Sequence, residues 1–251
     1  MKKIHSAITF FAVFAFLLLV QSSLAFGQKQ QISLADIWLS GKFRPDFPSE
    51  YNWMKDDNFY TELDGSKIEK FGIKDQSKVA TILDIATLKD PSGAGDLQVS
   101  SYRFSDEESK ILLIGDATPI YRHSTKEVCY VWDSKTNKVY RLHDAQPISF
   151  ATFSPDGNSV AYMADNNLFA YTFATNKEAT LSNDGSWGNI INGGTDWVYE
   201  EEFAFDKAFA WSPDSKKIAF YRFDESKVRE FNMAIYGELY PKEYKFKYPK
   251  A

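Results

Sequence analysis

The sequence has one cysteine, three histidines and few of the motifs that carry catalysis. Cys129 cannot form a disulfide within the chain, and its position in the apolar run VCYVW predicts a buried free thiol. No His, Cys or carboxylate residues cluster at metal-ligand spacing, and no Gly-rich phosphate loop occurs. The G-x-S-x-G pattern of a serine nucleophile is also absent, and the histidines His123 and His143 are expected to be surface or packing residues. The sequence therefore predicts no catalytic residue, no metal site and no cofactor.

Positive charge is also scarce. The 251 residues include 29 basic and 34 acidic residues, which gives a net charge of −5. Without Lys2 and Lys3, 27 basic residues remain against 34 acidic ones, so the rest of the chain carries −7. This balance argues against nucleic acid as a partner. A composition that is 44% hydrophobic and 16% aromatic predicts a folded protein with a large core.

The N terminus has the pattern of a secretory signal peptide. Two lysines precede a 14-residue apolar run at positions 7–20, and the segment QSSLAFG follows. We therefore expect residues 1–27 to direct export, to the periplasm or the cell exterior. The apolar run is shorter than the roughly 20 residues that span a bilayer, and an uncleaved membrane anchor is the alternative.

Residues 28–50 are expected to form a short helix and a linker. Ser33 precedes the run LADIWL, whose apolar residues have helical spacing, and Gly41 follows it. Serine is a preferred N-cap residue and glycine a common terminator of helices. The sequence therefore predicts one helical segment after the signal peptide.

From residue 51 onward the pattern is that of β-strands. Short apolar or alternating runs, such as residues 78–83 and 111–114, are separated by Asp, Asn, Gly and Ser. No long amphipathic helix separates these runs, which argues against a doubly wound parallel sheet. An all-β fold is expected over residues 51–251.

A repeated turn makes this expectation more specific. The motifs FSDE at 104–107, FSPDG at 153–157 and WSPDS at 211–215 each precede an apolar run, with spacings of 49 and 58 residues. A second recurring motif, TNK, occurs at 136–138 and 175–177. This period predicts an incomplete β-propeller of about four blades, each of four antiparallel strands, in which even the last residues, 245–251, are strand-like. A β-sandwich with similar turns is the alternative.

An acidic run interrupts the longer of the two spacings. Segment 190–203 reads IINGGTDWVYEEEF, and Asp196 is placed to cap a short helix. On such a helix Glu201 and Glu202 project about 100° apart, close enough to converge on one cation such as a protonated N terminus. Glu200 is expected to face solvent or to cap the helix, in a structural role. A solvated acidic turn is the alternative for the whole run.

The aromatic residues of this segment, Trp197, Tyr199 and Phe203, are expected to pack it against a blade. The segment as a whole closely resembles the double-glutamate motif of the dipeptidyl peptidase IV family, in the prolyl oligopeptidase class of serine peptidases. The segment YRHS at 121–124 resembles the strand that carries the substrate-binding arginine of that family. YPKA at 248–251 resembles a stretch beyond the motif, and the resemblance extends from about Ile32 to the end of the chain.

The resemblance implies roles for three residues. Glu201 and Glu202 resemble the pair that holds the protonated α-amino group of the substrate, and Arg122 resembles the residue that holds the carbonyl oxygen of the penultimate residue. An exported enzyme of this family releases N-terminal dipeptides whose second residue is proline or alanine. Its nucleophile would lie in a C-terminal α/β-hydrolase domain, so the chain alone is expected to be inactive.

Further expectations concern partners and alternative functions. Peptides with a free N terminus are the expected ligands, and homodimers are common in the family. A non-catalytic, exported propeller that binds proteins is an alternative function. A related peptidase with a different cleavage preference is another.

Overall fold

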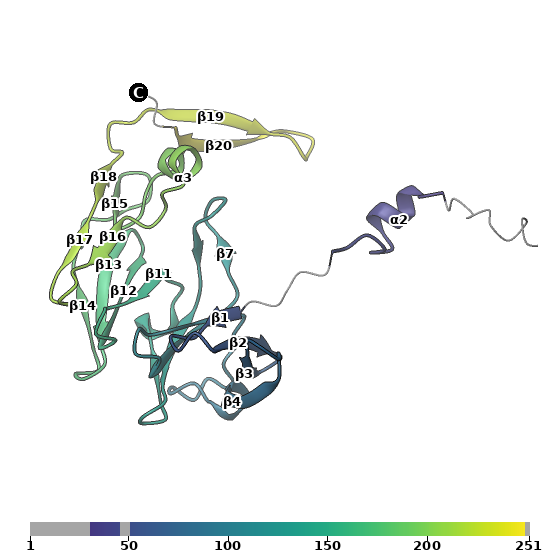
Figure 1. Cartoon of the computed structure of the whole chain (residues 1–251). Helices are drawn as coiled ribbons and strands as arrows, with labels where there is room; N and C mark the ends of the chain where they lie inside the picture. Colours follow the sequence, from purple (N-terminus) through teal and green to yellow (C-terminus); the bar gives the residue numbers. More distant parts are fainter. Residues whose placement is uncertain (1–30, 46–50, 249–251) are drawn as a thin grey trace, which may run out of the picture. The chain divides into compact units, whose positions relative to one another are not determined.

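The structure is a computed structural model that describes residues 31–45 and 51–248. The chain divides into two units, residues 1–48 and residues 49–251 (Figure 1). The expected signal peptide lies outside the described residues. In the first unit, α2 (Leu34–Trp38) begins at Ser33, whose hydroxyl accepts a hydrogen bond from the Asp36 N–H at 3.1 Å. Asp36 accepts from the Ser33 N–H at 2.9 Å, which completes a capping box and confirms the predicted helix start.

The second unit is built mainly of antiparallel β-sheets (Figure 1). Three of them have four strands each. They comprise β1 (Tyr51–Trp53), β2 (Phe59–Asp64), β3 (Lys67–Gly72) and β4 (Lys78–Asp84); β5 (Ser101–Phe104), β6 (Lys110–Ile114), β9 (Cys129–Asp133) and β10 (Lys138–Arg141); and β11 (Ser149–Phe153), β12 (Ser159–Ala164), β13 (Asn167–Thr172) and β14 (Lys177–Thr180). The strand orders are β1-β2-β3-β4, β10-β9-β6-β5 and β11-β12-β13-β14.

Four strand pairs complete the sheets that the structure describes. They are β7 (Thr118–Pro119) with β8 (Thr125–Lys126), β15 (Ile190–Asn192) with β18 (Arg222–Asp224), β16 (Phe209–Trp211) with β17 (Ile218–Phe220), and β19 (Glu230–Ile235) with β20 (Lys242–Lys247). Short helical segments are η1 (Ile85–Thr87), η2 (His143–Ala145) and α3 (Trp197–Phe203). The predicted strands at 78–83 and 111–114 are confirmed by β4 and β6.

The three repeated turns that begin at Ser105, Ser154 and Ser212 have one geometry. In each, the N–H of the fourth residue donates to the serine carbonyl at 2.8–2.9 Å, and the serine N–H donates to the carbonyl of the sixth residue at 2.8–2.9 Å. The fourth residue is left-handed in all three turns: Glu108 (φ 53°), Gly157 (φ 66°) and Ser215 (φ 60°). The turns join β5 to β6, β11 to β12 and β16 to β17, as the repeat predicts. The TNK segments likewise join β9 to β10 and β13 to β14.

Gly157 allows a direct test of this turn. Replacing it by alanine should lower the free energy of unfolding by about 1 kcal/mol, because a Cβ strains the left-handed conformation. The new Cβ would meet only ordinary contacts, the nearest being Ser105 Cβ at 3.5 Å. Gly237→Ala is the control, since Gly237 has no positive φ and open space around its Cβ position. Equal urea midpoints for the two variants would contradict this account.

Successive four-stranded sheets share apolar cores. One cluster joins the first sheet to the second and includes Ile68, Leu83 and Leu113; another joins the second to the third and includes Val131 and Tyr162. All of these side chains are buried. The segment 121–124, expected to be part of a strand, lies instead at the tip of the β7–β8 hairpin. Residues 121–123 form bends at this tip. Strand β7 ends before them at Pro119, and strand β8 begins after them at Thr125.

At the C-terminal end, the strand expected over residues 245–251 is confirmed only as far as Lys247, where β20 ends. Residues 249–251 lie outside the described residues.

Candidate functional site

The acidic run lies on α3, in the connection between β15 and β16. Asp196 caps the helix by accepting a hydrogen bond from the Tyr199 N–H at 2.9 Å, as predicted. The helix ends at Ala204, which is left-handed with φ 49°. Gly193 and Ala208 close the base of the excursion through a backbone hydrogen bond of 3.0 Å. The helix therefore projects from a fixed base, as expected for an insertion between repeats.

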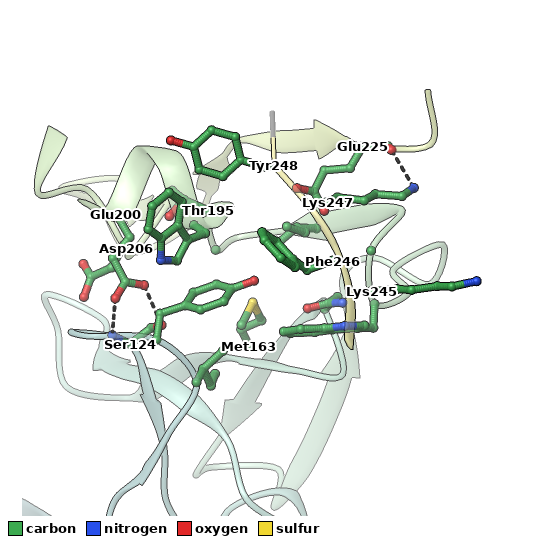
Figure 2. A pocket seen from close by; sticks show the side chains of 18 of the residues that line it. Ser124, Met163, Thr195, Glu200, Asp206, Glu225, Lys245, Phe246, Lys247 and Tyr248 are labelled. Atoms are coloured by element: carbon green, nitrogen blue, oxygen red, sulfur yellow. Dashed lines mark hydrogen bonds between the residues drawn. The ribbon is translucent and has the colours of Figure 1, made fainter. Parts of the chain in front are cut away.

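Glu200 is the most buried acidic residue of the run, with 1% of its surface exposed. Its carboxylate accepts hydrogen bonds from the Ser124 N–H at 3.1 Å and the Ser124 hydroxyl at 2.6 Å (Figure 2). It also accepts one from the His123 N–H at 2.6 Å. The expectation that Glu200 faces solvent or caps α3 is wrong. It has a structural role of another kind, because it ties α3 to the tip of the β7–β8 hairpin 76 residues earlier.

This tie brings Arg122 to the acidic run. Arg122 Nε lies 3.0 Å from Glu201 Oε1, and the Glu201 side chain is only 15% exposed, whereas that of Arg122 is 70% exposed. Glu202 is exposed, and within residues 31–45 and 51–248 its carboxylate makes neither an ion pair nor a hydrogen bond. Arg122 thus balances one charge of the pair, and the Glu202 carboxylate faces solvent.

The aromatic residues of α3 behave differently from one another. Trp197 packs on Tyr248, with ring centroids 5.1 Å apart, and Tyr199 packs on Phe223 at 4.9 Å. These contacts agree with the predicted packing role. Phe203 departs from it, because it is 67% exposed and its ring meets only that of Tyr199 within the described part of the chain. The C-terminal turn of α3 therefore presents an apolar side chain to solvent.

The two histidines expected to be surface or packing residues, His123 and His143, place no side chain in this site. The His123 N–H donates to Glu200, and its side chain is exposed. His143 Nδ1 lies 3.1 Å from Glu178 Oε2 and its ring packs on Phe169. Among residues 31–45 and 51–248, no group of three His, Cys, Asp or Glu side chains could hold a metal ion. No helix in the same ranges is long and apolar enough to span a membrane.

Cys129 is buried at 1% exposure, as predicted, and burial raises the pKa of its thiol to about 12. Since the thiolate is the reactive form, we expect native protein to resist a maleimide reagent at pH 8, whereas protein unfolded in urea should react fully. Mass spectrometry of the two samples would check this. Rapid labelling of the folded chain would contradict the burial of this residue.

Comparison with known proteins identifies the family. Residues 105–251 match the family described as the dipeptidyl peptidase IV N-terminal region. The chain is 31% identical to dipeptidyl aminopeptidase B of Saccharomyces cerevisiae over 223 residues, which cover 83% of this chain and 26% of that protein. It is 28% identical to human prolyl endopeptidase FAP over 225 residues, which cover 88% of this chain and 28% of that protein.

A solved structure agrees with these matches. The crystal structure of Porphyromonas gingivalis dipeptidyl peptidase 4 superposes with a TM-score of 0.77 at 35% identity, covering 88% of this chain and 32% of that chain. The chain therefore spans about a quarter to a third of the length of these relatives. Its sequence and its fold together show that the chain belongs to the dipeptidyl peptidase IV family and contains the N-terminal region of that family.

Proposed function

We propose that this chain is the N-terminal portion of an exported dipeptidyl peptidase and that α3 recognises the free N terminus of peptide substrates. The observation that carries the proposal is the 3.0 Å contact between Arg122 and Glu201, held in place by the buried Glu200. In this account Glu201 and Glu202 bind the α-ammonium group. Arg122 binds the carbonyl oxygen of the second-last residue before the cleavage site, which is the first residue of the released dipeptide.

The chemistry of the three side chains suits this role. A dipeptide-releasing enzyme must measure two residues from a free terminus, and a receptor for ammonium at a fixed distance from the nucleophile can do so. Arginine offers a rigid fork of donors: Nε engages Glu201, and in this account the terminal nitrogens donate to the substrate's carbonyl oxygen. An incoming ammonium would share Glu201 with Arg122 and engage Glu202 as well.

The sheets support a matching architecture. We interpret the three four-stranded sheets as consecutive blades of a β-propeller, and the shorter strand pairs after β14 as parts of a fourth. The boundaries follow the sequence prediction: a signal peptide at 1–27, a helix and linker at 28–50 and a partial propeller at 51–251. Export, a C-terminal α/β-hydrolase domain that supplies the catalytic serine, and homodimer formation belong to the same proposal.

Acetylation of the substrate tests this proposal. In the complete peptidase, a peptide with alanine or proline second should be cleaved, whereas its N-acetylated twin should lose about 100-fold or more in kcat/KM, because a charge-assisted interaction is removed. Equal kcat/KM for the two peptides would contradict recognition of the N terminus. Failure to cleave either peptide would favour a propeller that only binds proteins.

A further inference from the structure

A second feature beside α3 is a cavity of about 450 Å³ that the proposed N-terminus receptor does not use. It lies between the β7–β8 tip, the loop before β15, α3 and strand β20 (Figure 2). Arg122, Glu201 and Glu202 do not line it. Its size falls within the range of pockets that bind small organic molecules. The cavity is therefore a candidate binding site of its own.

Glu225 is the unusual residue of this cavity. It lies just after β18, is 8% exposed and lines the cavity wall. Within the described residues its carboxylate has no hydrogen bond and no ion pair; the nearby Lys247 ammonium donates instead to the Glu225 backbone carbonyl at 2.8 Å (Figure 2). A buried carboxylate without a partner is unfavourable, since desolvation penalises its charge.

The electrostatic surroundings of Glu225 are mainly negative. Burial is the main cause that raises the pKa of the Glu225 carboxyl, the nearby Asp196 raises it further, and Lys247 opposes this shift. Glu200 and Asp206 also line the cavity, and the Glu200 carboxylate is already occupied by the backbone and hydroxyl of the hairpin tip. Lys245 and Lys247 are the basic residues that line the cavity. Their ammonium groups are outnumbered by the carboxylates of Glu200, Asp206, Glu225 and the nearby Asp196, which favours a cationic ligand.

The other walls are aromatic. Tyr121 and Trp187 lie 6.1 Å apart between ring centroids on one side, and Trp197, Phe246 and Tyr248 line the remainder. Aromatic faces attract cations, and they also bury the apolar body of a ligand. A carboxylate among aromatic rings is the combination that recognises substituted ammonium groups.

We propose that this cavity binds an organic cation, an ammonium group on an apolar body, with the ammonium directed at Glu225. The aromatic side chains enclose the apolar body, and Asp196 adds to the negative potential. This site is independent of the proposed peptide receptor, because α3 contributes Trp197 and Glu200 to the cavity but Glu201 and Glu202 to the other site.

Phenethylammonium and its neutral counterpart 2-phenylethanol test the proposal. At pH 8, calorimetric titration of the full chain should show the ammonium compound binding about tenfold more tightly than the alcohol. In a background with Glu201→Gln and Glu202→Gln, which removes the carboxylates of the proposed peptide receptor, the difference should persist. Adding Glu225→Gln to that background should abolish it. Trp187→Ala, at a position 68% exposed, should weaken both compounds.

Three results would overturn the proposal. They are equal affinity for the two compounds in the wild-type chain, a preference that survives Glu225→Gln in the background lacking both receptor carboxylates, and a preference that Glu201→Gln together with Glu202→Gln removes. The last result would place the amine at the peptide receptor instead. Should Glu225→Gln fail to fold, an unchanged affinity of both compounds for Trp187→Ala would contradict the proposal on its own. Failure of peptide recognition leaves all of these outcomes unaffected.

The same carboxylate gives a prediction of stability. Because the folded state raises the pKa of Glu225 above its ordinary value of 4.5, the folded protein holds the proton more tightly than the unfolded chain does. Glu225 therefore lowers stability as the pH rises through its folded-state pKa. Glu225→Gln should raise the urea midpoint at pH 8 and leave it unchanged below pH 4.5. If Glu225→Gln instead lowered the urea midpoint at pH 8, the Glu225 carboxylate would already have a stabilising partner, which would contradict this prediction.

Discussion

Glu201→Ala should lower kcat/KM of the complete peptidase by about 100-fold on a peptide with a free N terminus. The Glu201 side chain is 15% exposed and pairs with Arg122, so its removal leaves both the guanidinium and the incoming ammonium without their shared partner. Because Arg122 is 70% exposed, the lost contact with the substrate sets the size of the effect. A hydrogen bond to a charged group contributes about 1.5–3 kcal/mol, and a factor of 100 corresponds to about 2.7 kcal/mol. Steady-state kinetics on a dipeptide p-nitroanilide would measure it.

Three further variants test whether the loss of kcat/KM arises at the proposed receptor. Glu202→Ala should also reduce kcat/KM, because we assign both carboxylates to the ammonium. Arg122→Lys should also reduce kcat/KM, although it keeps the positive charge, because lysine lacks the planar fork of donors. Glu230→Ala, on the exposed strand β19, removes an acidic residue elsewhere and should leave the kinetics unchanged. Wild-type kinetics for Glu201→Ala would reject the proposed receptor.

Glu200→Ala should be the most destabilising substitution in the acidic run. It leaves the N–H groups of His123 and Ser124 and the Ser124 hydroxyl without their acceptor, at a site where Ser124 is 5% exposed. Each such buried group costs about 1–3 kcal/mol, so we expect a loss of about 3 kcal/mol or more in the free energy of unfolding. Urea denaturation would measure this loss.

The same substitution should also weaken substrate recognition. Glu200 holds the hairpin tip that carries Arg122 against the helix that carries Glu201, so its loss should raise KM for a peptide with a free N terminus. Ser124→Ala, which removes one of the three hydrogen bonds, should have a smaller effect on both stability and KM. A Glu200→Ala variant with wild-type stability would show that this tie is dispensable.

Local patterns predicted much of the fold. The N-cap at Ser33, the cap at Asp196 and the repeated turns at Ser105, Ser154 and Ser212 depend on residues within five positions of one another. Each of these predictions is confirmed, because a turn or a cap is decided by nearby hydrogen bonds and backbone angles.

The incorrect predictions involve contacts between distant parts of the chain. The burial of Glu200 depends on backbone donors 76 residues away, which no local pattern reveals. The segment around Arg122 was predicted as a strand, yet only short strands flank it and Glu200 holds the tip itself. The cavity around Glu225 was not predicted, because it combines residues from segments far apart in the sequence.

The most direct test of the account is a crystal structure of the complete protein with a dipeptide amide bound. The account predicts that the α-ammonium nitrogen lies within about 3 Å of carboxylate oxygens of both Glu201 and Glu202, and that Arg122 donates to the carbonyl oxygen of the first residue. A dipeptide whose ammonium group lies away from α3, with the contact between Arg122 and Glu201 undisturbed, would contradict it.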